Sequence, residues 1–143
     1  MTLENLLRIG KVKAHVADED EIARLLAAAQ RALREASVRA LSSNGRLDLA
    51  YLALTQAALA ALRANGYRPS TSEPGHHQLV LQTLPKTIGL PPERVPVLDA
   101  YRKARNQADY HGVPVSNAVA DECVEAARRL LGEVRAWLDA RRR

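Results

Sequence analysis

The sequence contains very few aromatic residues. Phenylalanine is absent, and tyrosine and tryptophan together make up only 3% of the 143 residues. Strands are usually enriched in aromatic and β-branched residues, whereas a core of leucine, valine and alanine suits closely packed helices. Because 47% of the residues are hydrophobic and many of these are alanine, the composition favours an all-α protein over one built around a sheet.

The sequence also has only one cysteine, Cys123, and no long apolar run. A single cysteine allows no disulfide within the chain, which fits a reducing cytoplasm. Cys123 lies in a stretch with helical apolar spacing, so we expect it to be a small core residue. The apolar runs are shorter than a membrane span, and no signal peptide is recognisable. We therefore expect a cytoplasmic protein with no membrane association.

Positive charges outnumber negative charges in the chain. There are 21 lysine and arginine residues against 16 aspartate and glutamate residues, giving a net charge of +5. This excess is compatible with a polyanionic partner such as RNA. Alternatively, an arginine- and alanine-rich composition is what a GC-rich genome produces, and residues 141–143 form only a solvated tail. The charge alone leaves both interpretations open.

Apolar residues recur at helical spacing along most of the chain. Residues 3–15 show this spacing more weakly because Gly10 interrupts them. Residues 42–45 contain Asn44 and Gly45, which suit the left-handed end of a helix. The main helices are expected at residues 19–41 after an Asp18 N-cap, at 46–64, 76–88 and 93–110, and from a Ser116 or Asn117 cap to the end of the chain.

Outside the predicted helices, the sequence indicates loops and no strands. Residues 67–75 are rich in proline, glycine and serine and are predicted to form a loop. No stretch shows the period-two alternation of a strand. The helix over residues 46–64 is apolar on most sides and should be the most buried. We therefore predict an all-α, up-and-down bundle of four to five main helices, forming a single domain over residues 1–143.

Residues 105–112 gather the side chains that are best suited to chemistry on a phosphate. Arg105 offers a planar set of donors that matches phosphate oxygens. His111 can take or give a proton near neutral pH, and Asn106 can fix a phosphate or the imidazole tautomer. RNA supplies its own 2′-hydroxyl nucleophile, so a base, an acid and charge stabilisation suffice to cleave it without a metal. One histidine supplies half of such a site, unless a second copy of the chain supplies another.

Other residues near this segment are candidates for substrate binding. An alternative is that the segment is an ordinary helix end, with Arg105 paired to Asp109 four residues on and His111 capping the C-terminus. Adjacent histidines on a helix point in different directions and make a poor metal pair, so neither a metal nor a cofactor is expected. The candidate substrate-binding residues are Arg102, Lys103, Tyr110, His76 and His77.

The segment resembles the motif of the HEPN family (higher eukaryotes and prokaryotes nucleotide-binding). The family motif is an arginine followed by a polar residue, often asparagine, and then by a histidine after a short spacer. Here Arg105 and Asn106 precede His111 with five intervening residues. The run from Ala108 to Tyr110 also resembles small bacterial members, and the motif lies late in the chain before a long last helix, as in the family.

The resemblance implies a helical bundle that forms a homodimer, in which two motifs meet in a basic cleft and cleave RNA without a metal. Arg105 would hold the scissile phosphate, His111 would act as general base or acid, and Asn106 would position them, leaving a 2′,3′-cyclic phosphate. Many members are toxins, and some are paired with a nucleotidyltransferase-type antitoxin that modifies a tyrosine after the histidine. Here Tyr110 precedes His111, so this regulation is in doubt. Other members are non-catalytic modules that bind nucleotides, nucleic acids or proteins.

Overall fold

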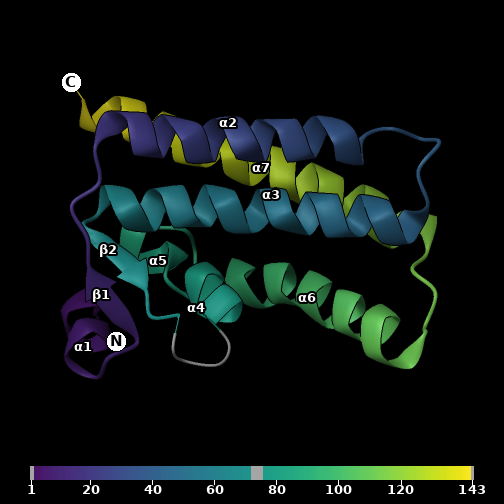
Figure 1. Ribbon diagram of the computed structural model, residues 1–143, viewed down its shortest axis with the longest axis horizontal. Helices are drawn as coiled ribbons and strands as arrows, with labels where there is room; N and C mark the ends of the chain where they lie inside the picture. Colours follow the sequence, from purple (N-terminus) through teal and green to yellow (C-terminus); the bar gives the residue numbers. More distant parts are fainter. Residues whose placement is uncertain (1, 72–75, 143) are drawn as a thin grey trace.

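The protein is a helical bundle with a very small sheet at one end (Figure 1). The computed structural model describes residues 2–71 and 76–142. The predicted all-α bundle is confirmed. The elements are α1 (Leu3–Arg8), β1 (Val12–Ala14), α2 (Glu19–Ala36), α3 (Ser43–Ala64), β2 (Tyr67–Pro69), α4 (His76–Gln82), α5 (Leu84–Thr87), α6 (Arg94–His111) and α7 (Asn117–Arg141).

Helix α3 runs through the middle of the bundle. Helices α2 and α7 pack along one side of it, and α4 and α6 lie on the other side (Figure 1). Ala50, Ala53, Ala57 and Ala60 of α3 are completely buried. Small side chains let neighbouring helix backbones approach closely, so a dense core forms without phenylalanine.

Helix α3 is also the one helix of the described residues that is long and apolar enough to cross a membrane. The sequence prediction of no such segment therefore missed α3, whose hydrophobic stretch is interrupted by Arg46, Asp48 and Arg63. Most of α3 is buried within the protein. Its apolar surface is thus covered by the other helices of the bundle, as in the core helix of a helical domain.

Four helices, α1, α2, α3 and α7, begin with side-chain caps of the kind that local sequence favours. The Asp18 carboxylate accepts a hydrogen bond from the Glu21 backbone N–H at 2.7 Å, and the Ser116 hydroxyl accepts one from the Val119 N–H at 3.1 Å. The Asp18 cap was predicted, and Ser116 is one of the two residues, with Asn117, that were predicted to cap the last helix. The prediction for residues 42–45 was wrong, because Ser42 caps the start of α3 and α2 already ends at Ala36. A serine hydroxyl that accepts from the third N–H of a helix stabilises its start.

The prediction of no strand was also wrong. Strands β1 and β2 pair antiparallel, with Val12 opposite Pro69 and Ala14 opposite Tyr67. Gly10 and Gly66 precede the two strands with φ angles of 80° and 93°, a region open to glycine at little cost. Strands of three residues are too short to show alternation, so residues 11–15 read as helix and residues 67–69 as loop. The remaining predicted loop residues, 72–75, lie outside the described residues.

The second half of the chain follows the predicted helices closely. Helix α6 ends at His111, and α7 begins at Asn117. The predicted helix over residues 76–88 is divided into α4 and α5, because Pro85 occupies the first turn of α5 and lacks an N–H to continue the α4 ladder. Cys123 is completely buried in α7, as expected.

The end of α7 is fastened to the end of α3. The Arg141 guanidinium donates a hydrogen bond to the Ala64 carbonyl oxygen at 2.7 Å. Its Cζ also lies 4.7 Å from the centre of the Trp137 ring. A guanidinium over an aromatic face is attracted by the ring quadrupole. The sole tryptophan of the chain therefore marks the end of the bundle at which α7 and α3 finish (Figure 1).

Candidate functional site

The C-terminal end of α6 carries the predicted motif. Gly112 adopts a left-handed conformation with φ 67° and ψ 16°, and its N–H donates to the Ala108 carbonyl oxygen at 3.2 Å. A glycine in this conformation ends a helix and satisfies its last carbonyl groups. His111 is therefore the last residue of α6, one residue beyond the predicted helix over residues 93–110.

The connection after this end is held against the start of α3. The Val115 N–H donates to Asn44 Oδ1 at 3.2 Å. The Ser43 hydroxyl also bonds to Asn117 Oδ1. These two contacts fix where α6 stops and α7 starts, so they also fix the position of the His111 backbone relative to α3.

Arg105 lies between α6 and α3. Its guanidinium carbon is 4.9 Å from the centre of the Tyr51 ring, and its Nε is 3.9 Å from Asp109 Oδ2. The second distance is too long for a hydrogen bond, and Arg105 Nε is buried with no hydrogen-bond partner among the described residues. The side chain is 33% exposed. The Arg105 side chain thus lies between the Tyr51 ring and Asp109 and remains partly exposed to solvent.

Two residues of α3 that the sequence analysis did not assign to the site accompany Arg105. Partial burial and the negative charge of Asp109 raise the pKa of Asp48, and the Arg105 guanidinium opposes this shift. Burial raises the pKa of Tyr51, again against the positive charge of Arg105. The site therefore contains a neutral phenol beneath the arginine and a carboxyl group that accepts a proton more readily than usual.

Tyr51 was expected to be a core residue with its hydroxyl at an edge. The residue is 1% exposed, but its hydroxyl oxygen is buried without a hydrogen-bond partner among the described residues. The sequence did carry one signal for Asp48. It is the only carboxylate in the helix predicted to be most buried, and it precedes Tyr51 by three residues, so both lie on one helix face.

The other predicted residues on α6 are less tightly grouped. Arg102 is paired within its own helix, because its Nε donates to Asp99 Oδ1 at 2.7 Å and its Nη2 to Asp99 Oδ2 at 3.1 Å. This bidentate pair raises the pKa of Arg102 and neutralises much of its charge. Lys103 is exposed and lines a separate cavity with Asp99 and Pro96.

The motif histidine is not in contact with the motif arginine in the single chain. His111 and Tyr110 are exposed, with Tyr110 at 78%. Within the part of the chain that the structure describes, the side chains of Asn106, Tyr110 and His111 form no hydrogen bond with one another. His111 can therefore face a second molecule, but one chain does not place it on Arg105.

The two adjacent histidines lie on another element. His76 is the first residue of α4, and His77 is exposed. His77 lines a mainly apolar cavity of about 280 Å³ with residues of α3 such as Leu59 and Arg63. In the described ranges, 2–71 and 76–142, no group of three or more His, Cys, Asp or Glu side chains could hold a metal ion.

Comparison with known proteins supports the family resemblance. Searches of curated proteins and of solved structures gave no match. The family model of the HEPN domain matches residues 22–137. This range runs from the start of α2 almost to the end of α7 and includes Arg105, Asn106 and His111. Because this match covers most of the chain and the observed fold is helical, the chain belongs to the HEPN domain family.

Proposed function

We propose that the protein is a metal-independent endoribonuclease that acts as a homodimer. The HEPN family includes both ribonucleases and nucleotide-binding modules. The observation that carries the proposal is the placement of Arg105. Its guanidinium lies between Tyr51 and Asp109, and its side chain is one third exposed, six residues before an exposed His111 at the helix end. A supported guanidinium is suited to binding a phosphodiester without large loss of side-chain freedom.

The reaction needs two proton transfers and no external nucleophile. A base removes the proton of the RNA 2′-hydroxyl, whose oxygen attacks phosphorus while the bond from phosphorus to the 5′-oxygen breaks. An acid gives a proton to the leaving 5′-oxygen. The products are a 2′,3′-cyclic phosphate and a 5′-hydroxyl. Arg105 stabilises the charge that develops on the phosphoryl oxygens, and His111 carries one of the two protons.

The second group that transfers a proton can come from a second copy of the chain or from the same chain. In a two-fold dimer the same surface is presented twice, so His111 of a second copy would stand opposite the first. A carrier within the same chain is Asp48, because its raised pKa favours proton uptake. Asp48→Asn separates the two, since it should leave cleavage by a His111 pair nearly unchanged and abolish cleavage that uses the carboxyl group.

A second candidate function is binding without cleavage. The Arg105 to Asp109 pair and the Asp99 pairing of Arg102 are what an ordinary helix end would show. In this case Arg105 would bind a nucleotide, a nucleic acid or a protein carboxylate, and His111 would carry no proton.

The deciding experiment is RNA cleavage in excess EDTA by a preparation whose dimeric state is checked by light scattering. We expect cleavage products that end in a 2′,3′-cyclic phosphate, and at least a hundredfold loss in Arg105→Ala and in His111→Ala, since general acid–base catalysis contributes about 10²–10⁴-fold. Arg24→Ala, which removes an exposed arginine of α2, is the matched control. Intact RNA with saturable binding would favour the second function, and equal cleavage by all variants would reveal a contaminating nuclease.

We also propose that the nuclease is a toxin held inactive by a nucleotidyltransferase-type antitoxin. Tyr110 is 78% exposed and lies next to His111, so an attached nucleotide would block the motif. Expression of the chain should arrest growth, with relief by His111→Ala. If relief by the antitoxin acts through Tyr110, mass spectrometry should find the added nucleotide there, and Tyr110→Phe should prevent relief.

A further inference from the structure

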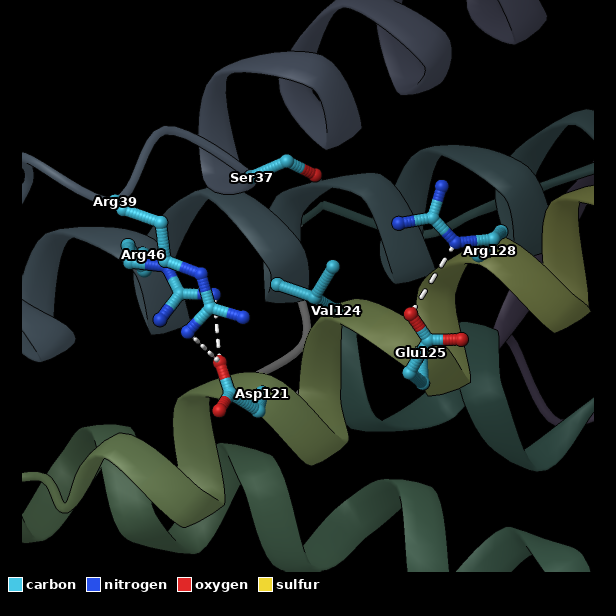
Figure 2. A pocket seen from close by; sticks show the side chains of 7 residues that line it. All are labelled: Ser37, Arg39, Arg46, Asp121, Val124, Glu125 and Arg128. Carbon is cyan, nitrogen blue, oxygen red and sulfur yellow. Dashed lines mark hydrogen bonds and ion pairs between the residues drawn. The ribbon is translucent and has the colours of Figure 1, made fainter.

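A second group of arginines lies on the other side of α3. A cavity of about 220 Å³ opens between the end of α2, the start of α3 and the first half of α7 (Figure 2). We name it the arginine pocket. None of the residues that line it belongs to α6, the helix that carries Arg105 and His111. The lining residues are Ser37, Arg39, Arg46, Asp121, Val124, Glu125 and Arg128.

Arg46 is the fixed part of the arginine pocket. Its side chain is only 5% exposed. Its Nε donates to the Ala36 carbonyl oxygen at 2.9 Å, and its Nη2 donates to Asp121 Oδ1 at 2.8 Å. A buried charge is tolerated only with such partners. Because both bonds hold the guanidinium in one orientation, it has little freedom left to lose when a ligand binds.

Two further arginines of the pocket are much more exposed than Arg46. The side chains of Arg39 and Arg128 are 75% and 54% exposed. Arg39 meets Asp121 at 3.2 Å, and Arg128 meets Glu125 at 3.4 Å. Exposed ion pairs of this kind contribute little to stability, so a better acceptor can replace the carboxylates.

The geometry of the pocket suits an oxyanion. Figure 2 shows Arg39 and Arg46 side by side, both directed at Asp121, with Arg128 on the other side of Val124. Three guanidinium groups face two carboxylates, and Arg39 and Arg46 share a single carboxylate oxygen. The Arg46 guanidinium, with Arg39, lowers the pKa of Asp121, as a positive local potential would. Guanidinium groups match the oxygen spacing of phosphate better than any other side chain.

We propose that the arginine pocket binds a phosphate group, supplied either by a free phosphoanion or by the backbone of an RNA chain. Arg46 provides a fixed positive charge and those N–H groups that are not bonded to Ala36 or Asp121, and Arg39 and Arg128 turn from their carboxylates onto the phosphate oxygens. The site lies at the same end of α3 as Asp48, but on the face covered by α2 and α7. Phosphate binding here requires neither His111 nor RNA cleavage.

The test is a titration followed by the arginine Nε–H signals in proton–nitrogen NMR spectra. The three ligands are inorganic phosphate, pyrophosphate and a short 2′-O-methyl RNA, which lacks the nucleophile for cleavage, each against chloride at constant ionic strength. We expect a saturable shift of the Arg46 signal. Arg39→Gln or Arg128→Gln should weaken binding about tenfold, which corresponds to about 1.4 kcal/mol, while Arg24→Gln on the exposed face of α2 should have no effect. All three positions are exposed, so the variants should remain folded.

Removing a negative charge from the arginine pocket gives a second test of phosphate binding. Glu125 is 72% exposed and competes with the ligand for Arg128, so Glu125→Gln should tighten binding. Saturation by phosphate or pyrophosphate identifies a free phosphoanion site, whereas saturation by the RNA alone identifies the RNA backbone, and either supports the proposal. The absence of saturation with all three ligands, or equal weakening by Arg24→Gln, would overturn it. Because the RNA used cannot be cleaved, failure of the proposed nuclease activity would not produce that result.

Discussion

Replacing Tyr51 by phenylalanine removes one oxygen atom from the space beneath Arg105. That oxygen is buried and has no hydrogen-bond partner among the described residues. Burial of a hydroxyl group without a partner costs about 1–3 kcal/mol in proteins. Tyr51→Phe should therefore stabilise the fold by up to about that amount, which would raise the melting temperature by about 2–4 °C for each kcal/mol in a chain of this size.

The same change should leave the motif arginine in place. In the parent protein the centre of the Tyr51 ring lies 4.9 Å from the Arg105 guanidinium carbon. A phenylalanine ring attracts a cation nearly as well as a tyrosine ring does. We expect RNA binding and cleavage by Tyr51→Phe to stay within about twofold of the parent. Tyr51→Leu keeps an apolar side chain but removes the ring, and should lose about 0.5–2 kcal/mol of that attraction together with the placement of Arg105.

Urea unfolding followed by circular dichroism, with cleavage assays on the same preparations, gives both readouts. If Tyr51→Phe lowers the free energy of unfolding by more than about 1 kcal/mol, the typical value of one hydrogen bond, then the hydroxyl is hydrogen-bonded and the reasoning fails. If Tyr51→Leu is as active as the parent, the ring does not position Arg105.

Three further predictions test other parts of the structure. Cys123 is completely buried, and burial raises its pKa to about 12, so the thiol should resist alkylation at pH 8 until the protein is denatured, as mass spectrometry would show. The His15 contact and the Arg63 guanidinium lower the pKa of Glu21, so its stabilising effect should be present above the ordinary carboxyl pKa and fade as pH falls below it. Glu21→Gln should flatten that acid dependence of the melting temperature. Gly112→Ala should cost about 1–2 kcal/mol in urea unfolding because its φ is 67°, and Gly112→Asn should cost less.

Local sequence predicted the features that short-range chemistry determines. Asp18 and Ser116 are capping residues, and Gly112 is a helix-ending residue, so the starts of α2 and α7 and the end of α6 could be read directly. The strand pair could not, because residues 12–14 and 67–69 are defined only by their contact with each other. The α2 boundary was misjudged because residues 42–45 contain signals for a helix end and a helix start at once.

The candidate site divides in the same way. Arg105 and His111 were predicted from their residue types, their spacing and their position before the long last helix. Asp48 and Tyr51 lie near Arg105 only because α3 packs against α6. A local sequence pattern does not predict which helices pack against each other. The arginine pocket also depends on packing, since Arg46 of α3 and Asp121 of α7 meet only in the folded bundle.

The position of Trp137 has a practical consequence for optical work. Trp137 is packed with Arg141 at the end of α7, beside the end of α3, whereas α6 finishes with the motif at the opposite end (Figure 1). Tryptophan emission thus reports whether the two long helices stay joined at their C-terminal ends. It is a local probe for fraying and for global unfolding, and it should stay silent while ligands are added to the motif. A fluorophore on the RNA would be the appropriate signal for binding.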